Sequence, residues 1–355
     1  MRLLLRWNQL VILLLLCAAF FAARDAFFGV AKLARASTAA AGTGVAMPSA
    51  AATVVSSAAA GTSGTCAVVM ERLMATQPAV AWPPPCPLPA NSPLRAGYEG
   101  PGGSMPITRD YCFAQRYEGE LVLDWSESFI SGYCGDLAAG RAFGTYGVVD
   151  DLRFRGALAQ VPGLPGSVGM VLGSELPWVE CFALAAGAGA VWTFEYATIQ
   201  STHPQLFAKP TKTMAAEHLS GALPLVDWVV CYSSMEHSGL GRYGDALNPD
   251  ADREALAQAW CFLKPGGHLL LGLPMSCEAN GFVEFNAHRV YGYKRLAYVA
   301  DGFELAAAAY KCQWLDTGST AIVILRKPAN GVRAPPITLE EFAAADSRAG
   351  VQPSG

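Results

Sequence analysis

A polar segment near the middle of the chain holds side chains that can do acid–base chemistry. Residues 233–245 directly follow an apolar run and place an acid, an imidazole, a guanidinium and a phenol among glycines. Histidine titrates near neutral pH, so His237 is a candidate general base, with Asp245 as another candidate. A guanidinium holds anionic or hydroxyl-rich groups, so Arg242 is a candidate to bind a substrate, together with Glu236 and Tyr243.

A second polar segment, residues 286–291, follows the next apolar run. We interpret it as a loop that supplies another candidate base, His288, and further candidate substrate contacts, Asn286, Arg289 and Tyr291. Each residue taken alone is also compatible with a structural role. Loops that follow parallel strands open on the same edge of a sheet, so we expect the two segments to form one site.

A short turn with one glycine and a later acid indicate a nucleotide-type cofactor. Gly173, Ser174 and Glu175 follow an apolar run, and Glu195 ends the next one, 22 positions after Gly173. An acid at about this spacing is placed to accept hydrogen bonds from ribose hydroxyls. Nucleotide loops usually carry several glycines, so the alternative that Glu195 is a solvated strand-end carboxylate stays open.

Short apolar runs bounded by turn residues predict the strands that position these loops. They are typical of strands buried on both faces. The runs span residues 167–172, 191–196, 227–232 and 268–273, and two more strand candidates, 303–310 and 320–327, follow near the end of the domain.

Amphipathic helices alternate with these strands. Pro177 suits the first position of a helix that ends at Gly187, and Asp250 or Asp252 caps another that stops at residues 264–267. Strand–helix–strand units force parallel pairing, and the last two strands predict an antiparallel hairpin at one edge. The sequence therefore predicts a doubly wound, mostly parallel α/β sheet of Rossmann-like type.

The first 35 residues are interpreted as a signal anchor. Arg2 and Arg6 precede an apolar stretch from Trp7 to Ala23, which is 17 residues and the lower limit for a membrane span. A cleavable signal peptide and an organellar transit peptide are the alternatives. The anchor predicts a single-pass membrane protein of the endomembrane system or Golgi, and cleavage would make the protein secreted.

Composition divides the rest of the chain. Residues 36–106 are rich in Ala, Ser, Thr and Pro and are interpreted as a low-complexity spacer, followed by an N-terminal subdomain at 107–160. The α/β domain spans 161–328, and 329–355 form a C-terminal tail. Only 15% of residues are charged, the net charge is −4 and no basic block occurs, so nucleic acid is not expected as a partner.

Seven of the ten cysteines fall into two groups. Cys181, Cys231 and Cys261 lie inside apolar elements and are interpreted as buried thiols. Cys66, Cys86, Cys112 and Cys134 lie outside these apolar elements, and they are the expected disulfide formers if the domain is luminal. No CxxC motif occurs, and no metal site is expected.

Several motifs resemble known families. In order and spacing, four stretches are similar to the class I S-adenosylmethionine-dependent methyltransferases, in particular their type-11 group: residues 216–219, 226–231, 235–237 and 263–269. Three further stretches resemble the domain of unknown function family number 268: residues 173–180, 236–245 and 286–292. The second resemblance extends over roughly residues 107 to 327.

The methyltransferase resemblance implies S-adenosylmethionine as cofactor. By position, Glu195 would bind its ribose, and Glu217 or His218 would lie beside its adenine. The Gly173 loop would face the methionine moiety, with Ser174, Glu175 and Ser233 as the remaining cofactor contacts.

The favoured hypothesis is a methyltransferase that O-methylates a glycan or a small molecule of the secretory pathway. An oxygen acceptor needs a base, for which His237, His288 and Asp245 are the candidates. One alternative is a cofactor-less methyltransferase-fold binding module on a membrane, and a less favoured one is a glycosyltransferase. The acceptor, the membrane topology and the oligomeric state stay open.

Overall fold

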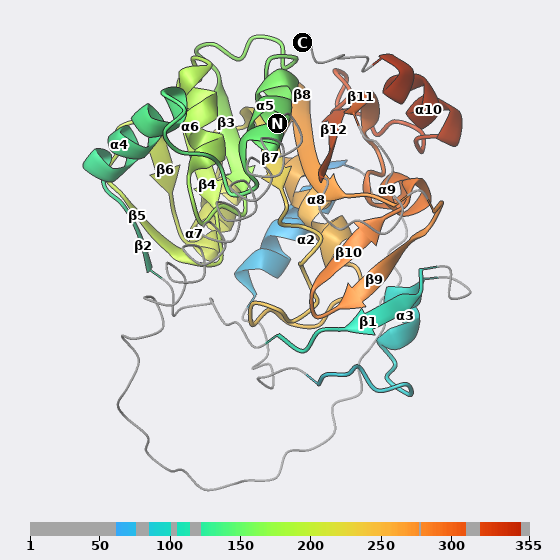
Figure 1. Ribbon diagram of the computed structural model, residues 1–355. Coiled ribbons are helices and arrows are strands. Elements are labelled where there is room, and N and C mark those ends of the chain that lie inside the picture. Colours follow the sequence, from blue (N-terminus) through green and yellow to red (C-terminus); the bar gives the residue numbers. More distant parts are fainter. Residues whose placement is uncertain are drawn as a thin grey trace, which may run out of the picture. The chain divides into compact units, whose positions relative to one another are not determined.

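A mixed sheet forms the centre of the computed structural model, which describes residues 62–75, 85–100, 105–113, 122–276, 278–309 and 320–348 (Figure 1). The chain divides into two compact units, 1–58 and 59–355, and all described residues belong to the second. Within them, seven strands form the sheet in the order β11-β12-β8-β7-β3-β4-β6. Their bounds are β3 Val168–Leu172, β4 Ala190–Phe194, β6 Leu206–Ala208, β7 Val226–Tyr232, β8 Leu263–Pro274, β11 Glu304–Ala309 and β12 Thr320–Arg326.

The order of these strands reverses beside β3. From β3 the chain passes through α6 (Trp178–Ala185) to β4 and β6, and then returns through α7 (Thr211–Leu219) to β7 on the other side of β3. The strands from β6 to β8 are parallel, and β12 is antiparallel to both of its neighbours, β8 and β11. This is a Rossmann-like order with one antiparallel strand inserted near an edge. The predicted doubly wound fold and its edge hairpin are confirmed.

Helices cover both faces of the sheet (Figure 1). On one face α4 (Glu127–Ala138), α5 (Val148–Leu158) and α6 surround Phe154 and Trp178. The core of the other face includes Met214 and Trp260 and is shared by α2 (Thr62–Met74), α7, α8 (Ala251–Phe262), α9 (Tyr293–Val299) and α10 (Leu339–Arg348). Because both faces are covered, the central strands consist of nearly continuous apolar residues.

A smaller sheet lies near the carboxyl end of β8. In it β1 (Ile107–Asp110) pairs in parallel with β9 (Gly281–Phe285), which pairs antiparallel with β10 (His288–Tyr291). The short helix α3 (Arg95–Glu99) packs on β9, where the ring centroids of Tyr98 and Phe285 are 5.5 Å apart. Elsewhere, β2 (Val122–Trp125) pairs with β5 (Thr198–Ser201). The prediction that 286–291 form a loop is wrong, because Asn286 and Ala287 make a hairpin turn and residues 288–291 form strand β10. The polar residues at the start of β10 are not typical of a strand, so the sequence did not indicate it.

Parts of the predicted domain division are wrong. In the predicted spacer, α2 buries Met70 completely, because apolar residues recur at helical spacing at Cys66, Val69, Met70 and Leu73. Residues 107–160 do not form a separate subdomain, since β1 joins the smaller sheet while α4 and α5 join the main core. In the predicted tail, α10 buries Phe342 against the same core.

Disulfides connect several of these elements. In the described part of the chain they join Cys66 to Cys261, Cys86 to Cys112 and Cys134 to Cys181, and Cys231 is a buried free thiol. All the cysteines expected to form disulfides do so. Cys181 and Cys261 are buried as predicted, but the prediction that they are thiols is wrong, because each lies on a helix face that meets a cysteine of a packed helix. Burial raises the pKa of the Cys231 thiol to about 12.

The signal anchor predicted for residues 1–35 lies outside the described residues. The helices that are described are short, with α2 spanning 13 residues and α8 spanning 12. A membrane span needs about 20 apolar residues. Of these described helices, none is long and apolar enough to cross a membrane.

Replacing both Cys134 and Cys181 by Ala should lower the free energy of unfolding by about 2–4 kcal/mol, because the disulfide restricts the unfolded chain. Urea denaturation under non-reducing conditions measures this loss. Cys231→Ala is the matched control, since it removes a buried thiol without a cross-link and should cost about 1 kcal/mol. Equal losses in the two proteins would contradict a stabilising disulfide between α4 and α6.

Candidate functional site

A pocket opens where the strand order reverses. Its walls come from the ends of β3, β4 and β7 and from α8, and include Leu172, Gly173, Phe194, Glu195, Ser234 and Met235. Gly173 and Glu195 are therefore brought together, as predicted from their spacing. An apolar pocket with a few polar groups is typical of a small-molecule site.

Gly173 is required here for its conformation and for space. Its φ of 80° lies in the left-handed region, and a Cβ at this position would overlap the Ser234 side chain. The ends of β3 and β7 therefore approach each other closely. The Gly173 N–H donates to the Phe194 carbonyl at 2.8 Å, and this hydrogen bond connects the turn after β3 to the end of β4.

Glu195 holds the next residue of this turn. Its Oε2 accepts from the Ser174 N–H at 2.6 Å, and its Oε1 accepts from the Tyr196 N–H at 2.6 Å. Burial raises the pKa of the Glu195 carboxyl, whereas these backbone N–H groups lower it. The alternative of a solvated strand-end carboxylate is therefore disfavoured. The Glu195 carboxylate therefore fixes the backbone of the turn at Ser174.

Glu180 joins the turn to the sheet and was not predicted. It is 0% exposed on α6, and its carboxylate accepts from the hydroxyls of Ser174 at 3.1 Å and Thr193 at 2.8 Å. Burial raises the pKa of Glu180 to about 7. The signal that could have found it is an acid in the first turn of an otherwise apolar helix. Exposed Glu175 lies at the rim of the same turn.

Glu217 and His218 lie away from the pocket. Both belong to the last turn of α7, whereas the first residue of that helix, Thr211, lies beside Glu195 and donates to its carbonyl at 3.5 Å. The His218 ring instead contacts Phe262, at the end of α8, with centroids 5.1 Å apart. The prediction that either residue lies beside the cofactor adenine is therefore wrong. Helix α7 begins beside the pocket and runs toward the end of the sheet where β7 starts, and both residues lie at that far end of the helix.

A conformationally strained residue directly follows β7. Ser233 has a φ of 49°, which is uncommon outside glycine. Its hydroxyl interacts with the Glu236 carboxylate and with the Tyr146 hydroxyl. Ser234, and not Ser233, is among the residues that line the pocket. Ser233 contacts the cluster formed by Glu236 and Tyr146 instead of taking the predicted role of a cofactor contact.

His237 is brought beside the hairpin as predicted. Its Nδ1 lies 2.6 Å from the Ala287 carbonyl, so this nitrogen carries the proton and donates, and Nε2 lies 3.7 Å from Oε1 of Glu236. Burial lowers the pKa of His237 to about 3, so the ring is neutral. The His237 and His288 ring centroids are 6.1 Å apart. The two polar segments therefore converge.

The other candidate bases are engaged locally. Nε2 of His288 lies 3.0 Å from Oε2 of Glu284, although the two groups are not aligned for a hydrogen bond. Burial lowers the pKa of His288, and Glu284 opposes this effect. Asp245 accepts from the backbone N–H groups of Gly239 at 2.6 Å, Gly241 at 3.3 Å and Tyr243 at 3.2 Å. These contacts give Asp245 the role of shaping its own loop.

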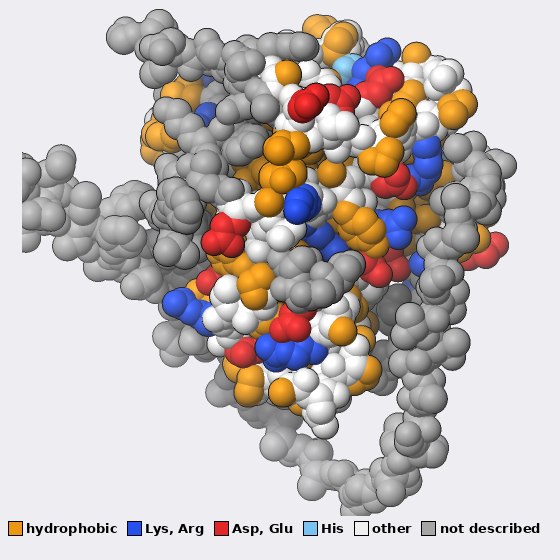
Figure 2. Space-filling model, turned by 90° about the vertical axis from the view of Figure 1, so that its right-hand side faces the viewer, with side chains coloured by type: hydrophobic (Ala, Val, Ile, Leu, Met, Phe, Trp, Pro, Cys, Tyr) orange, Lys and Arg blue, Asp and Glu red, His pale blue; other side chains and the backbone are white. Residues whose placement is uncertain are grey.

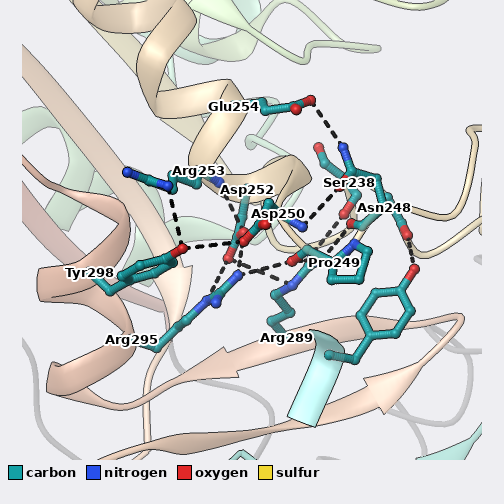
Figure 3. Close-up of polar contacts among 12 residues, drawn as sticks. Ser238, Asn248, Pro249, Asp250, Asp252, Arg253, Glu254, Arg289, Arg295 and Tyr298 are labelled. Carbon is teal, nitrogen blue, oxygen red and sulfur yellow. Dashed lines mark hydrogen bonds and ion pairs between the residues drawn. The ribbon is translucent and has the colours of Figure 1, made fainter. Parts of the chain in front are cut away.

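Arg289 anchors the loop from inside (Figure 3). It is 1% exposed and donates to the carbonyls of Ser238 at 2.6 Å, Asn248 at 3.3 Å and Pro249 at 3.2 Å. Its Nε lies 3.6 Å from Asp252, which also pairs with Arg295 at 2.6 Å. Burial alone would raise the pKa of Asp252, but the charges of Arg289 and Arg295 outweigh it and lower that pKa.

Two other predicted substrate contacts are also buried. The Tyr291 hydroxyl donates to Asp252 at 3.2 Å, and the Asn286 amide donates to the Leu240 carbonyl at 3.4 Å. Both side chains are 0% exposed. As arranged, Arg289, Tyr291 and Asn286 hold the loop and the hairpin together and present no exposed surface for a substrate.

Arg242 and Tyr243 remain at the open side of the cluster. The Arg242 guanidinium stacks over the Phe113 ring at 4.9 Å and over the Tyr243 ring at 5.0 Å. The Tyr243 and His237 ring centroids are 5.7 Å apart. A partly exposed guanidinium between aromatic rings suits an anionic or hydroxyl-rich group.

The pocket residues fit an adenosyl cofactor. The Glu195 carboxylate can accept from a pair of hydroxyls, and it lies beside the apolar walls formed by Leu172, Phe194 and Met235. The turn after β3, however, has no glycine besides Gly173, and Ser174 is held by the carboxylates of Glu195 and Glu180. No group of three or more His, Cys, Asp or Glu residues suited to a metal ion occurs in the described ranges.

Comparison with known proteins finds a family model that matches the central part of the chain. Residues 166–317 match the family described as "Caenorhabditis protein of unknown function, DUF268", which confirms the resemblance seen in the motifs. No curated protein matches the sequence.

Solved structures of methyltransferases are distantly similar. Magnesium protoporphyrin IX methyltransferase from Synechocystis, with bound S-adenosylhomocysteine, is 11% identical, with a TM-score of 0.36 and coverage of 56% of this chain and 96% of that one. The N-methyltransferase NodS from Bradyrhizobium japonicum, also with S-adenosylhomocysteine, is 14% identical, with a TM-score of 0.33 and coverage of 57% and 98%. The fold assignment rests on the strand order described above.

Arg289→Met should lower the free energy of unfolding by about 3–5 kcal/mol, because it removes one of the two guanidiniums that pair with buried Asp252 and leaves three carbonyls of the loop without their donor. Urea denaturation measures the change. Arg253→Met on α8 is the matched control, since its guanidinium contacts only the exposed hydroxyl and ring of Tyr298 in the described chain and should cost less than about 1 kcal/mol. Similar small losses in both variants would show that the buried network does not anchor the loop.

Proposed function

We propose that this protein is an S-adenosylmethionine-dependent methyltransferase whose cofactor binds in the pocket at the carboxyl ends of β3, β4 and β7. One observation carries the proposal: Gly173 and the Glu195 carboxylate meet in an apolar pocket at the reversal of the strand order. Ribose hydroxyls donate to such a carboxylate. The walls formed by Leu172, Phe194 and Met235 suit an adenine ring and a thioether.

The residues of the chain then have defined tasks. When bound, S-adenosylmethionine supplies an activated methyl group. The protein must hold an acceptor in line with that group and take up the acceptor's proton. Of the predicted bases, Asp245 and His288 are held by neighbouring groups, and His237 is a neutral ring whose Nε2 faces Glu236.

We extend the proposal to O-methylation of a glycan or another small molecule of the secretory pathway. The disulfides support an oxidising compartment, where such bonds persist. The stacked guanidinium of Arg242 supports an acceptor with hydroxyl or anionic groups. With the predicted anchor, the protein would be a single-pass endomembrane or Golgi protein, or a secreted one if the segment is cleaved.

Nucleic acid is not proposed as a partner. The net charge is −4, and on the face shown in Figure 2 acidic and basic side chains are intermingled with hydrophobic ones. A phosphate backbone binds to clustered positive charge.

A glycosyltransferase is not favoured. Asp250 and Asp252 form an Asp-x-Asp sequence of the kind that can hold a metal–nucleotide, but Asp252 is 0% exposed and bound to Arg289 and Arg295. The cofactor-less binding module remains the competing hypothesis, and cofactor binding distinguishes it from the methyltransferase.

Calorimetric titration of the full-length protein with S-adenosylmethionine and S-adenosylhomocysteine should show micromolar binding. Glu195→Ala should weaken it about tenfold or more, because charge-assisted hydrogen bonds to the ribose are lost. Glu217→Ala is the control, since Glu217 lies in the last turn of α7, away from the pocket, where its carboxylate pairs with Lys209, and the affinity should stay unchanged. A folded protein that binds neither compound would support the cofactor-less module.

A further inference from the structure

Cofactor binding leaves one buried carboxylate beside the pocket unexplained. Glu236 is 1% exposed, and within the described residues its Oε2 has no hydrogen-bond partner. Leaving a buried charged oxygen unpaired is costly, so such groups in native proteins call for an explanation such as a catalytic role. Glu236 follows Ser234 and Met235, which line the pocket.

Within the described residues, the groups around Glu236 contact its carboxylate but leave Oε2 without a hydrogen-bond partner. The Ser233 hydroxyl interacts with it, and Nε2 of His237, which carries no proton, lies 3.7 Å from Oε1. The Arg242 guanidinium acts on it from the loop. From β10, the Arg289 N–H donates to the Glu236 carbonyl at 2.9 Å and so fixes the backbone.

Tyr146 also belongs to this cluster. It precedes α5, is 42% exposed and interacts with the Ser233 hydroxyl. Its ring packs against Tyr232, at the end of β7, with centroids 5.5 Å apart. Ser233 therefore lies between an accessible phenol and a buried carboxylate, and its strained backbone keeps it there.

The cluster borders the cofactor pocket. Glu175, in the turn after β3, interacts electrostatically with Glu195 in the pocket and with Arg242 in the cluster, and it also acts on Tyr146. The turn at Gly173 meets Ser234, the neighbour of Ser233. A group bound in the pocket would therefore lie next to an acceptor bound at the cluster.

We propose that Glu236 is the catalytic base of this enzyme, with Ser233 and Tyr146 as positioning residues at the acceptor side. The inference rests on the proposed methyltransferase function. Oε2 of Glu236 takes the proton of the acceptor hydroxyl. The electron pair left on the acceptor oxygen forms the bond to the methyl carbon, and the sulfur keeps the pair of the bond that breaks.

Sinefungin tests this assignment without a known acceptor. It is an analogue of S-adenosylhomocysteine that carries an ammonium group where the transferable methyl stands, so its binding reports a carboxylate at the acceptor side. The full-length protein is titrated with both compounds at pH 8, above the value of about 7 to which burial raises the pKa of Glu236. We expect sinefungin to bind about tenfold more tightly than S-adenosylhomocysteine, as for one added charge-assisted contact.

Glu236→Gln should abolish most of this preference while S-adenosylhomocysteine still binds, and Ser233→Ala should reduce it in part. Glu284→Gln is the matched control, since Glu284 is also a buried carboxylate beside a histidine, and the preference should persist there. A preference that is absent from the wild type or unchanged in Glu236→Gln overturns the assignment of the base. If folded wild-type protein binds neither compound, the methyltransferase function itself fails, and this inference fails with it.

Discussion

The position of the segment after β7 depends on one buried charge, the carboxylate of Asp252. Burial of an isolated carboxylate is strongly unfavourable, so the guanidiniums of Arg289 and Arg295 are drawn to it from β10 and α9. Arg289 also donates hydrogen bonds to backbone carbonyls of the loop, those of Ser238, Asn248 and Pro249. One ion network thus ties α8, the hairpin and the loop together and places Glu236 and His237 at the end of β7.

A second constraint is the close approach of β3 and β7. With Gly173 against Ser234, the two strand ends leave room for a pocket only on the side of β4 and α8. The same approach brings the Glu175 turn next to Arg242. All described non-glycine residues with positive φ, Cys112, Ser233 and Asn286, lie in segments that border the polar cluster. Such strain is typical of sites where geometry serves function.

Much of the fold could be predicted from the sequence, because buried parallel strands are unbroken apolar runs and their helices keep helical spacing. Glu195 was predictable for the same reason, since strand order places its carboxylate beside the Gly173 turn. The role of a polar side chain was harder to predict. Arg289 and Asp245 have the residue types of a site, yet tertiary contacts with Asp252 and with backbone N–H groups occupy them. Spacing also does not say which end of a helix faces the pocket, so Glu217 and His218 were misplaced.

A crystal structure of the protein with S-adenosylhomocysteine tests most directly whether the pocket at the carboxyl ends of β3, β4 and β7 is a cofactor site. We expect density for the ligand in this pocket, with its ribose hydroxyls within about 3.2 Å of the Glu195 carboxylate and its sulfur near the border formed by Gly173 and Ser234. An empty pocket in crystals saturated with ligand, or density for the ligand elsewhere, would contradict the proposed function.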